Sequence, residues 1–373
     1  MIKEFTSLGL MSGTSGDGVD TSIIKSDGVT KYKVIKDKYF EYDNDIYENI
    51  HNLKEIIHNS RDLQKFKDQI NSLERKITLF HAKITKELAE KNELDIIGFH
   101  GQTIYHNPLE NISFQLGDGN LLFQLLNTDI VYKFRQNDIK NGGEGAPLAP
   151  IFHQLIAKEK KLILPICILN IGGISNITII KDFNEQMGFT SRDIGPGNCL
   201  IDSWVRKNSK KKFDQNGFLA TKGARNEIIF EQAQELYSNR LNKKKLSFDV
   251  NDFDVSFARG LSLEDGVTTL TDFTASIIGA ALTSQISNFG IKPFKVLVCG
   301  GGRKNKSLIE KIKKNTLKNI VIQSIDDYGV NGDFVESQAF AFLAIRSILK
   351  LPISFPNTTG CKQASTGGEI IKH

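Results

Sequence analysis

The chain has 373 residues, 40% hydrophobic and 24% charged, which is enough for two folded domains with sizeable cores. Its 48 basic residues are nearly balanced by 43 acidic ones and are scattered along the chain, which argues against nucleic acid as a partner. Four widely spaced cysteines form no CxxC pair, and no segment approaches the ~20 apolar residues that span a bilayer, so neither a zinc site nor a membrane anchor is indicated. We expect a cytoplasmic protein without nucleic-acid or membrane partners, and leave a homodimer open.

The first predicted element is a β-hairpin. Residues 5–11 and 18–24 are apolar, extended runs on either side of the tip SGTSGDG. Glycines allow such a turn to point several backbone N–H groups into one concavity, which suits an anion. The turn lacks both the lysine of a P-loop and the glycine spacing of a dinucleotide fingerprint. The alternative is an ordinary hairpin turn, in which Asp17 and Asp20 only accept hydrogen bonds from nearby N–H groups.

Helices are expected next, because apolar residues recur at i, i+3 and i+4 from Asp45 to Lys91. LDIIGFHGQTIYH then predicts a buried strand followed by a loop, and GDGNLLFQLLN predicts a turn that leads into a helix. His100 and Gln102 come directly after the predicted strand, where α/β proteins tend to place substrate contacts. The glycine- and proline-rich stretch FRQNDIKNGGEGAPLAP predicts a connection, with a hinge at 138–146.

The strand and glycine pattern then recurs twice. LILPICILNIGGISNITII, residues 162–180, repeats the order of apolar run, tight turn and apolar run, and VLVCGGGRKNKSLIEKI places three glycines between a buried strand and a helix. Strands that alternate with helices predict an α/β fold whose ligands lie outside the carboxyl ends of the strands. Two cycles that each open with a glycine-tipped hairpin predict two related lobes with a nucleotide cleft between them.

The chain resembles the anhydro-N-acetylmuramic acid kinases over nearly its whole length. Eight motifs occur in the order found in that family: GLMSGTSGDGVD, FHGQTIYH, FRQNDIKNGGEGAPLAP, NIGGISNIT, DIGPGNCLID, VCGGG, DFVESQAFAFLAIR and FPNTTG. The resemblance implies two actin-like (ribonuclease H-like) lobes, here residues 1–138 plus about 352–373 and residues 139–351. It also implies an ATP- and Mg²⁺-dependent enzyme of cell-wall recycling, which opens 1,6-anhydro-N-acetylmuramic acid with water and phosphorylates O6.

Site residues follow from these motifs. For ATP we expect the hairpin and the later glycine turns: Gly13, Thr14, Ser15, Gly16, Asp17, Gly18, Val19, Asp20, Gly172, Gly173, Gly195, Gly300, Gly301 and Gly302. The resemblance assigns Asp193 as the general base and points Glu336 at the substrate. For the sugar we expect His100, Gln102, Arg135 and Asp138, with the planar guanidinium of Arg135 suited to the lactyl carboxylate of the substrate. No metal ligand is assigned.

Each assignment has a structural alternative. Asp193 could cap the helix that follows it, Glu336 could be a solvated neighbour of an apolar helix face, and Arg135 and Asp138 could form a surface ion pair. Strand-to-helix glycine turns also occur for packing reasons alone. A related kinase for another sugar or a carboxylate, or a nonenzymatic nucleotide-binding module, is the alternative function.

Three residues depart from the family pattern, and one of them is Ile194, which gives Asp-Ile-Gly where the family commonly has Asp-Thr-Gly. Gly16 stands where the family usually has a bulky apolar residue, and Glu144 makes GGEG of the usual GGQG. We expect Gly16 to make the hairpin tip more flexible and Glu144 to add negative charge where an anionic substrate would bind.

Overall fold

The computed structural model describes residues 3–90, 92–241, 246–290 and 293–372, and the chain divides into two compact units. Unit 1 comprises Met1–Ile163, Asp182–Ser191 and Phe334–His373, and unit 2 comprises Leu164–Lys181 and Arg192–Asp333. These limits differ from the boundaries expected at 138/139 and near 351/352. Residues 139–163 and 334–351 belong to unit 1, because their helices pack against its sheet and against one another.

Unit 1 is built on a seven-stranded sheet in the order β12-β6-β4-β1-β2-β3, with β5 paired to β4. Its first three strands form an antiparallel meander, and β4 and β6 then add parallel to β1 and to β4. The short β12 pairs antiparallel with β6. The strands are β1 Phe5–Ser12, β2 Gly18–Ser26, β3 Tyr32–Glu41, β4 Ile96–Asn107, β5 Ile112–Leu116, β6 Asp129–Tyr132 and β12 Glu369–Ile371.

The helices of unit 1 follow the expected periodicity. In α1 (Asn44–Ile56), Asp43 caps the N-terminus and Ile46, Ile50 and Leu53 recur on one buried face. The predicted helical region ended at Lys91, which lies outside the described residues. The other helices are α2 Ser60–Lys65, α3 Lys67–Ala89, α4 Gly119–Leu126, α5 Gln136–Lys140, α6 Pro150–Glu159, α11 Val335–Ile348 and α12 Pro356–Thr359.

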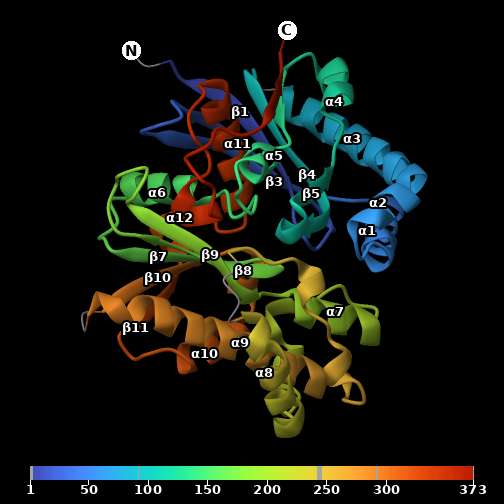
Figure 1. Cartoon of the computed structure of the whole chain (residues 1–373), viewed down its shortest axis with the longest axis vertical. Coiled ribbons are helices and arrows are strands. Elements are labelled where there is room, and N and C mark those ends of the chain that lie inside the picture. Colours follow the sequence, from blue (N-terminus) through green and yellow to red (C-terminus); the bar gives the residue numbers. More distant parts are fainter. Residues whose placement is uncertain (1–2, 91, 242–245, 291–292, 373) are drawn as a thin grey trace. The chain divides into compact units, whose positions relative to one another are not determined.

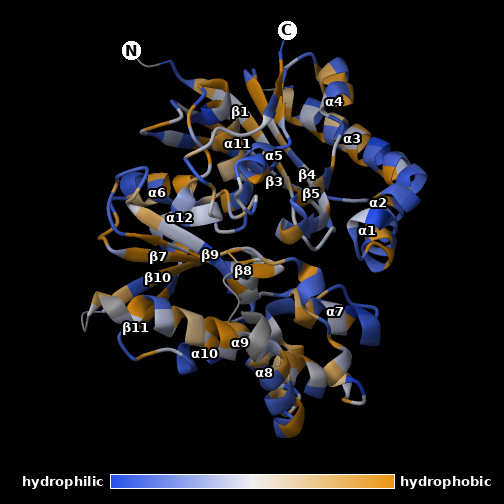
Figure 2. Ribbon diagram, viewed as in Figure 1, coloured by the Kyte–Doolittle hydropathy of each residue, from blue (hydrophilic) through white to orange (hydrophobic). Residues whose placement is uncertain are grey.

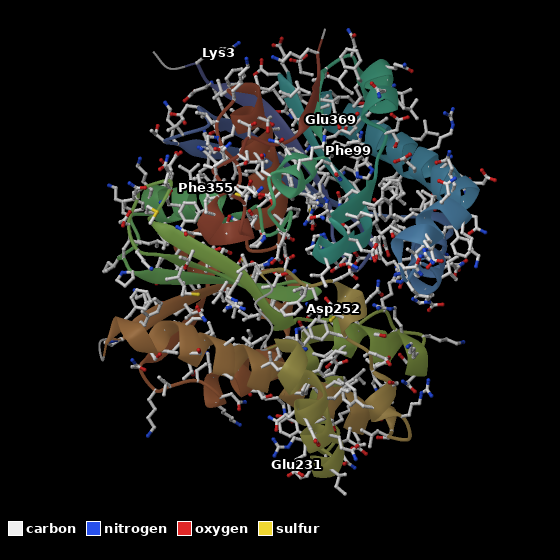
Figure 3. All side chains as sticks on the ribbon, viewed as in Figure 1. Lys3, Phe99, Glu231, Asp252, Phe355 and Glu369 are labelled. Carbon is white, nitrogen blue, oxygen red and sulfur yellow. The ribbon has the colours of Figure 1, made fainter. Side chains whose placement is uncertain are left out.

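Helix α11 lies against the strands β1, β2 and β4 of unit 1 (Figure 1). The strands make room for it with glycine, since a Cβ atom on Gly9 would lie 1.9 Å from the carbonyl oxygen of Ser337, and one on Gly98 would lie 2.4 Å from that of Phe340. Phe99, from the next position on β4, is buried in the core of the unit, whereas Glu369 of β12 lies half-exposed at the sheet edge (Figure 3). Close backbone contact therefore joins α11 to β1 and β4.

Unit 2 has a five-stranded sheet in the order β11-β10-β7-β8-β9. Strands β7 and β8 form an antiparallel hairpin, and β10 and β11 add in parallel on the other side of β7. Figure 2 shows β7, β8 and β10 mostly in the hydrophobic colour, and all six residues of β7 are buried. The strands are β7 Ile166–Ile171, β8 Ile174–Ile180, β9 Phe189–Pro196, β10 Phe294–Cys299 and β11 Ile320–Ser324.

Two hydrophobic clusters form the core of unit 2. One joins β7, β8 and β10 to α9 and α10, and the other joins α7, α8 and α9, where Trp204 and Phe273 are buried. Glu231 on α8 is exposed to solvent (Figure 3). The helices are α7 Cys199–Asn208, α8 Glu227–Leu241, α9 Leu263–Ile286 and α10 Lys306–Lys314.

Both sheets have the same strand order. Numbered within each unit, the strands lie in the order 3-2-1-4-5, as β3-β2-β1-β4-β6 in unit 1 and β9-β8-β7-β10-β11 in unit 2. In each unit the first strand turns back at glycines into the antiparallel second strand, while the fourth strand runs parallel to the first. This is the ribonuclease H-like arrangement, so the predicted α/β class with two related lobes is confirmed.

One predicted element is wrong in its extent. HGQT was expected to be a loop, but β4 continues through it to Asn107. Gly101 adopts φ +75°, and the register of β4 against β1 shifts at this residue. Beyond it the strand pairs antiparallel with β5, a strand that the sequence analysis did not predict. The glycine that resembled the end of a strand is therefore a bulge within it.

Two other expectations concern thiols and membranes. Cys167, Cys199, Cys299 and Cys361 are all free, as their spacing predicted. Among the described residues, no helix is both long enough and apolar enough to cross a bilayer.

Candidate functional site

The predicted ATP-binding residues near the N-terminus form the tip of the β1–β2 hairpin in unit 1. Residues 13–17 make the turn, whereas Gly18, Val19 and Asp20 already belong to β2 and pair with β3. Within the described part of the chain, no hydrogen bond engages the backbone amides of Thr14, Ser15 or Asp17. A turn with three unengaged amides has the donors that an anion needs.

Side chains from outside the turn engage its carbonyl groups, in addition to the amide of Gly16, which donates to the carbonyl oxygen of Gly13 at 3.2 Å. Gln102 Nε2 on β4 donates to the carbonyl oxygen of Gly13 at 3.0 Å, and Lys54 Nζ on α1 donates to that of Thr14 at 2.7 Å. Gly16 adopts φ +66°, and a Cβ atom there would lie 2.8 Å from Cγ2 of Ile50. A side chain there would strain the backbone and crowd Ile50, so the conformation favours glycine, and the expected flexibility of the tip stays a prediction.

A buried polar chain lies beside the start of the tip. Ser12, the last residue of β1, has its hydroxyl 2.7 Å from the hydroxyl of Tyr42 and 3.4 Å from Nε2 of His81. His81 Nδ1 lies 2.8 Å from the carbonyl oxygen of Ile77, so that nitrogen carries the proton and Nε2 accepts. Burial lowers the pKa of His81 to about 4, which keeps the imidazole neutral.

His100, beside the bulge within β4, meets Arg135, which follows β6. The Nδ1 of His100 lies 2.7 Å from the carbonyl oxygen of Gly101 and must donate to it, so Nε2 carries the lone pair. Arg135 donates to that Nε2 from Nη2 at 3.0 Å, and from Nη1 to the carbonyl oxygen of Gly145 at 3.2 Å. Burial and the charge of Arg135 hold the pKa of His100 well below its ordinary value, so a neutral imidazole orients the guanidinium.

Asp138 is buried, and both of its carboxylate oxygens accept hydrogen bonds within unit 1. One oxygen accepts from the amide of Gly145 at 2.7 Å and the other from the hydroxyl of Thr359 at 2.7 Å. The side chain is only 1% exposed, so the alternative of a surface ion pair with Arg135 does not describe it. Asp138 instead ties the glycine-rich segment to α12, and its expected contact with the sugar stays a prediction.

Glu336 lies half-buried in the first turn of α11. The two residues that follow it anchor this turn to the sheet, since the hydroxyl of Ser337 lies 2.7 Å from that of Ser22, and Gln338 Nε2 donates to Asp37 at 3.1 Å. Burial raises the pKa of the Asp37 carboxyl. The turn that carries Glu336 is thus held by buried hydrogen bonds.

Three glycine segments converge in unit 2, at the carboxyl ends of β7, β9 and β10. The carbonyl oxygen of Gly173 accepts from the amide of Gly197 at 2.8 Å, and that of Gly172 accepts from the amide of Asn198 at 2.8 Å. A Cβ atom on Gly300 would lie 2.4 Å from Oδ1 of Asn170, and one on Gly302 would lie 2.2 Å from Ile171. The segments around Gly172, Gly195 and Gly300 therefore form one small region of unit 2, and their expected contacts with ATP stay predictions.

Asp193 lies in β9 next to this region and is 6% exposed. Its Oδ2 accepts from the amide of Phe248 at 2.8 Å, and its own amide donates to the carbonyl oxygen of Leu246 at 2.7 Å. Helix α7 begins at Asn198 without a side-chain cap, so the alternative role of Asp193 as a helix cap is excluded. A buried carboxylate at a strand end can hold a water molecule for chemistry.

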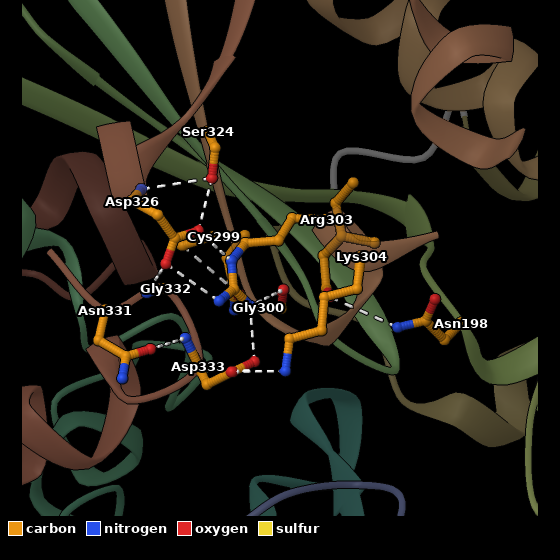
Figure 4. Close-up of polar contacts among 12 residues, drawn as sticks. Asn198, Cys299, Gly300, Arg303, Lys304, Ser324, Asp326, Asn331, Gly332 and Asp333 are labelled. Carbon is orange, nitrogen blue, oxygen red and sulfur yellow. Dashed lines mark hydrogen bonds and ion pairs between the residues drawn. The ribbon is translucent and has the colours of Figure 1, made fainter. Parts of the chain in front are cut away.

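Arg303 braces the third glycine segment (Figure 4). Its guanidinium donates to both oxygens of Asp326, at 2.6 and 3.1 Å, to Asp333 at 2.6 Å and to the carbonyl oxygen of Gly300 at 3.1 Å. Burial alone would raise the pKa of Asp326, but hydrogen bonds from Arg303, Gly332 and Ser324 lower it strongly. The turn Gly300–Gly302 is thereby held in place by a charged network.

Sequence reasoning missed several of these residues. The sequence analysis placed Lys54 and His81 in a predicted helical region and assigned no function to either, or to Tyr42. It quoted Arg303 only as part of the run VLVCGGGRKNKSLIEKI, and Asp326 not at all. The only available signals were adjacency, since Arg303 directly follows the glycines and Asn170 precedes Gly172 by two residues. Within the described ranges, no three His, Cys, Asp or Glu side chains are grouped to hold a metal ion.

Two ribonuclease H-like sheets, each with glycine turns at the carboxyl ends of its strands, define an α/β protein of the actin-like nucleotide-binding class. Comparisons with known proteins narrow this class. A family model described as anhydro-N-acetylmuramic acid kinase matches residues 5–373, and the chain belongs to this family.

Relatives with the same name cover essentially the whole chain. The sequence is 56% identical over 375 residues to the anhydro-N-acetylmuramic acid kinase of Pelagibacter ubique, with all of both chains covered. It is 37% identical to that of Zymomonas mobilis, with 97% of this chain and 98% of the relative covered. Among solved structures, the activator of the 2-hydroxyisocaproyl-CoA dehydratase from Clostridium difficile with bound ADPNP covers 91% of this chain and 94% of its own, at 12% identity and a TM-score of 0.41.

Proposed function

We propose that this protein is an ATP-dependent kinase that opens 1,6-anhydro-N-acetylmuramic acid hydrolytically and phosphorylates its O6, giving N-acetylmuramic acid 6-phosphate and ADP. The reaction belongs to peptidoglycan recycling in the cytoplasm. Family membership over residues 5–373 supports the substrate. The observation that carries the chemistry is the buried Asp193 beside the converging glycine segments of unit 2.

Asp193 is the proposed general base. Water adds to C1 of the sugar and gives its proton to the carboxylate, while the C1–O6 bond breaks. The released O6 forms a bond to the γ-phosphorus, and the bond from that phosphorus to ADP breaks. The hydrogen bond from the Phe248 amide to Oδ2 supports this role, because it fixes the carboxylate in one orientation before water binds.

The backbone amides of Thr14, Ser15 and Asp17 are proposed phosphate donors, with Gly172, Gly173 and Gly300–Gly302 as the nucleotide-contacting turns of unit 2. Mg²⁺ would neutralise the polyphosphate and usually keeps only one or two carboxylate ligands beside phosphate oxygens and water. Asp17 fits such a site. One of its carboxylate oxygens accepts a hydrogen bond from the hydroxyl of Ser15, and the other accepts none from the described residues.

Arg135 is the proposed partner of the lactyl carboxylate. His100 Nε2 and the carbonyl oxygen of Gly145 both accept hydrogen bonds from its guanidinium, which supports the role because they orient a planar, charged donor that suits a carboxylate. His100 then acts through Arg135. Glu336, in the anchored first turn of α11, is proposed to bond sugar hydroxyls.

The variant Asp193→Asn tests the proposed base. An asparagine keeps an oxygen for the Phe248 amide but cannot take a proton, so we expect turnover of the anhydro sugar to fall about 10²–10⁴-fold while ATP affinity stays within about twofold. Coupled release of ADP measures turnover, and calorimetry with a nonhydrolysable ATP analogue measures binding. Asp327→Asn, an exposed aspartate of the same unit, is the control. Wild-type turnover in Asp193→Asn would refute the assignment.

A further inference from the structure

We propose that Lys54 on α1 is a positioning residue of the phosphate-binding turn, and that Gln102 on β4 is its counterpart. Each clamps one carbonyl oxygen of the hairpin tip and thereby aims the N–H of the same peptide group at the nucleotide. The inference rests on the proposed use of ATP. It assigns Gln102 a role different from the sugar contact expected from its sequence position.

The clamps come from two different elements. Lys54 Nζ donates to the carbonyl oxygen of Thr14 at 2.7 Å across 40 residues, and Gln102 Nε2 donates to that of Gly13 at 3.0 Å across 89 residues. Gln102 is fully buried, and its Nε2 also donates to the carbonyl oxygen of Thr103 at 3.3 Å. Each of the two side-chain nitrogens therefore donates a hydrogen bond to a carbonyl oxygen of the turn.

Helix α1 is fixed where this contact requires it. Ile50 and Leu53, on the same helix, are buried in the core of unit 1. Ile50 also lies against Gly16, within 2.8 Å of a Cβ atom built there. A lysine one residue after Leu53 consequently reaches the tip from a rigid support.

A hydrogen bond to a carbonyl oxygen also fixes the direction of the N–H of the same peptide group. In a trans peptide the C=O and the N–H lie in one plane and point in opposite directions. A bond to the Gly13 carbonyl thus sets the direction of the Thr14 amide, and a bond to the Thr14 carbonyl sets that of the Ser15 amide. Both amides have no hydrogen-bond partner among the described residues.

The charge of Lys54 strengthens the effect. A charged donor on a carbonyl oxygen polarises the peptide group and makes its N–H a better donor. The turn's own sequence has no lysine, unlike a P-loop, so this cation reaches it from a helix about 40 residues further along the chain. The Lys54 ammonium donates to a carbonyl oxygen, which points away from the N–H of the same peptide group, so its proposed role is to orient the turn.

The test compares ligands with and without phosphates. We expect Lys54→Met to weaken binding of a nonhydrolysable ATP analogue about tenfold, to leave adenosine binding unchanged and to leave the KM for the sugar within about twofold. Lys54→Arg, which keeps a charged donor, should restore most of the ATP affinity. Gln102→Met should act in the same direction as Lys54→Met. Lys76→Met, which removes an exposed lysine paired with Asp45, is the matched control.

Two results would overturn the inference: unchanged ATP affinity in Lys54→Met, or an equal loss of affinity for ATP and adenosine. Melting temperatures check that each variant is folded, and Lys54→Gln, a neutral donor expected to give an intermediate ATP affinity, serves if the methionine variant does not fold. The proposed function fails separately. If the wild-type protein binds ATP but does not convert the anhydro sugar, the function is wrong while the Lys54 effect on ATP binding still stands.

Discussion

Single residues carry most of the specificity that we propose, and Arg135 is the clearest case. A histidine that burial keeps neutral and one backbone carbonyl group accept hydrogen bonds from it, so these two partners orient the guanidinium. A planar guanidinium held in this way can bond a carboxylate through two parallel N–H groups. Lysine cannot reproduce that geometry.

We therefore expect Arg135→Lys to raise the KM for the anhydro sugar about tenfold, because one of two charged hydrogen bonds is lost. The KM for ATP should stay unchanged. Steady-state kinetics with 1,6-anhydro-N-acetylmuramic acid and with 1,6-anhydro-N-acetylglucosamine, which lacks the lactyl carboxylate, measures the difference. The variant should discriminate less between the two sugars.

Arg61→Lys, at an exposed arginine of α2, is the control for general effects of the exchange. An unchanged KM for the lactyl sugar in Arg135→Lys would show that Arg135 is a structural brace for Gly145 and His100. Thermal unfolding separates that outcome from a loss of folded protein.

Among the secondary-structure elements, helix α11 shows how the sheet of unit 1 accommodates a close neighbour. The helix packs on β1 and β4 at Gly9 and Gly98, where any side chain would meet helix backbone. Backbone cannot move aside as the end of a flexible side chain can. These glycines are thus fixed by packing rather than by a turn.

Gly9→Ala should therefore lower the free energy of unfolding by about 1–3 kcal/mol, the usual cost of overpacking a close contact. Urea titration followed by circular dichroism measures it. Gly301→Ala is the control, since a Cβ atom built on Gly301 meets nothing within 4 Å. Equal stability of Gly9→Ala and the wild type would contradict the observed packing of α11 on β1.

Local patterns predicted most of these elements. The hairpins around Gly13 and Gly172, helices α1, α3, α4, α7, α10 and α11, and the strand before Gly300 all follow from periodicity and glycine position. The continuation of β4 past Gly101 could not be predicted in this way, because a glycine followed by polar residues is found both at a bulge within a strand and at the end of a strand. Strand β5 could not be predicted either, because it pairs with the part of β4 beyond that bulge.

At the scale of the whole molecule, two units share one strand order, and their glycine turns lie at equivalent strand ends. The repeated hairpin pattern predicted this relation. The limits of the units could not be predicted, because they depend on contacts between distant residues, such as that of Ser22 with Ser337 of α11, 315 residues apart. The proposed role of Lys54 could not be predicted for the same reason, because it depends on a contact with a turn 40 residues away. Sequence patterns report local geometry, whereas these contacts come from the folded chain.

The central claim is that O6 of the anhydro bridge becomes the phosphate ester oxygen. The most direct measurement supplies the protein with ATP, Mg²⁺ and 1,6-anhydro-N-acetylmuramic acid that carries ¹⁸O in the bridge, and locates the label by the isotope shift in the ³¹P spectrum. We predict a 6-phosphate in which ¹⁸O joins C6 to phosphorus. Absence of a phosphorylated sugar, or a 6-phosphate with ¹⁶O at that position, would contradict the account.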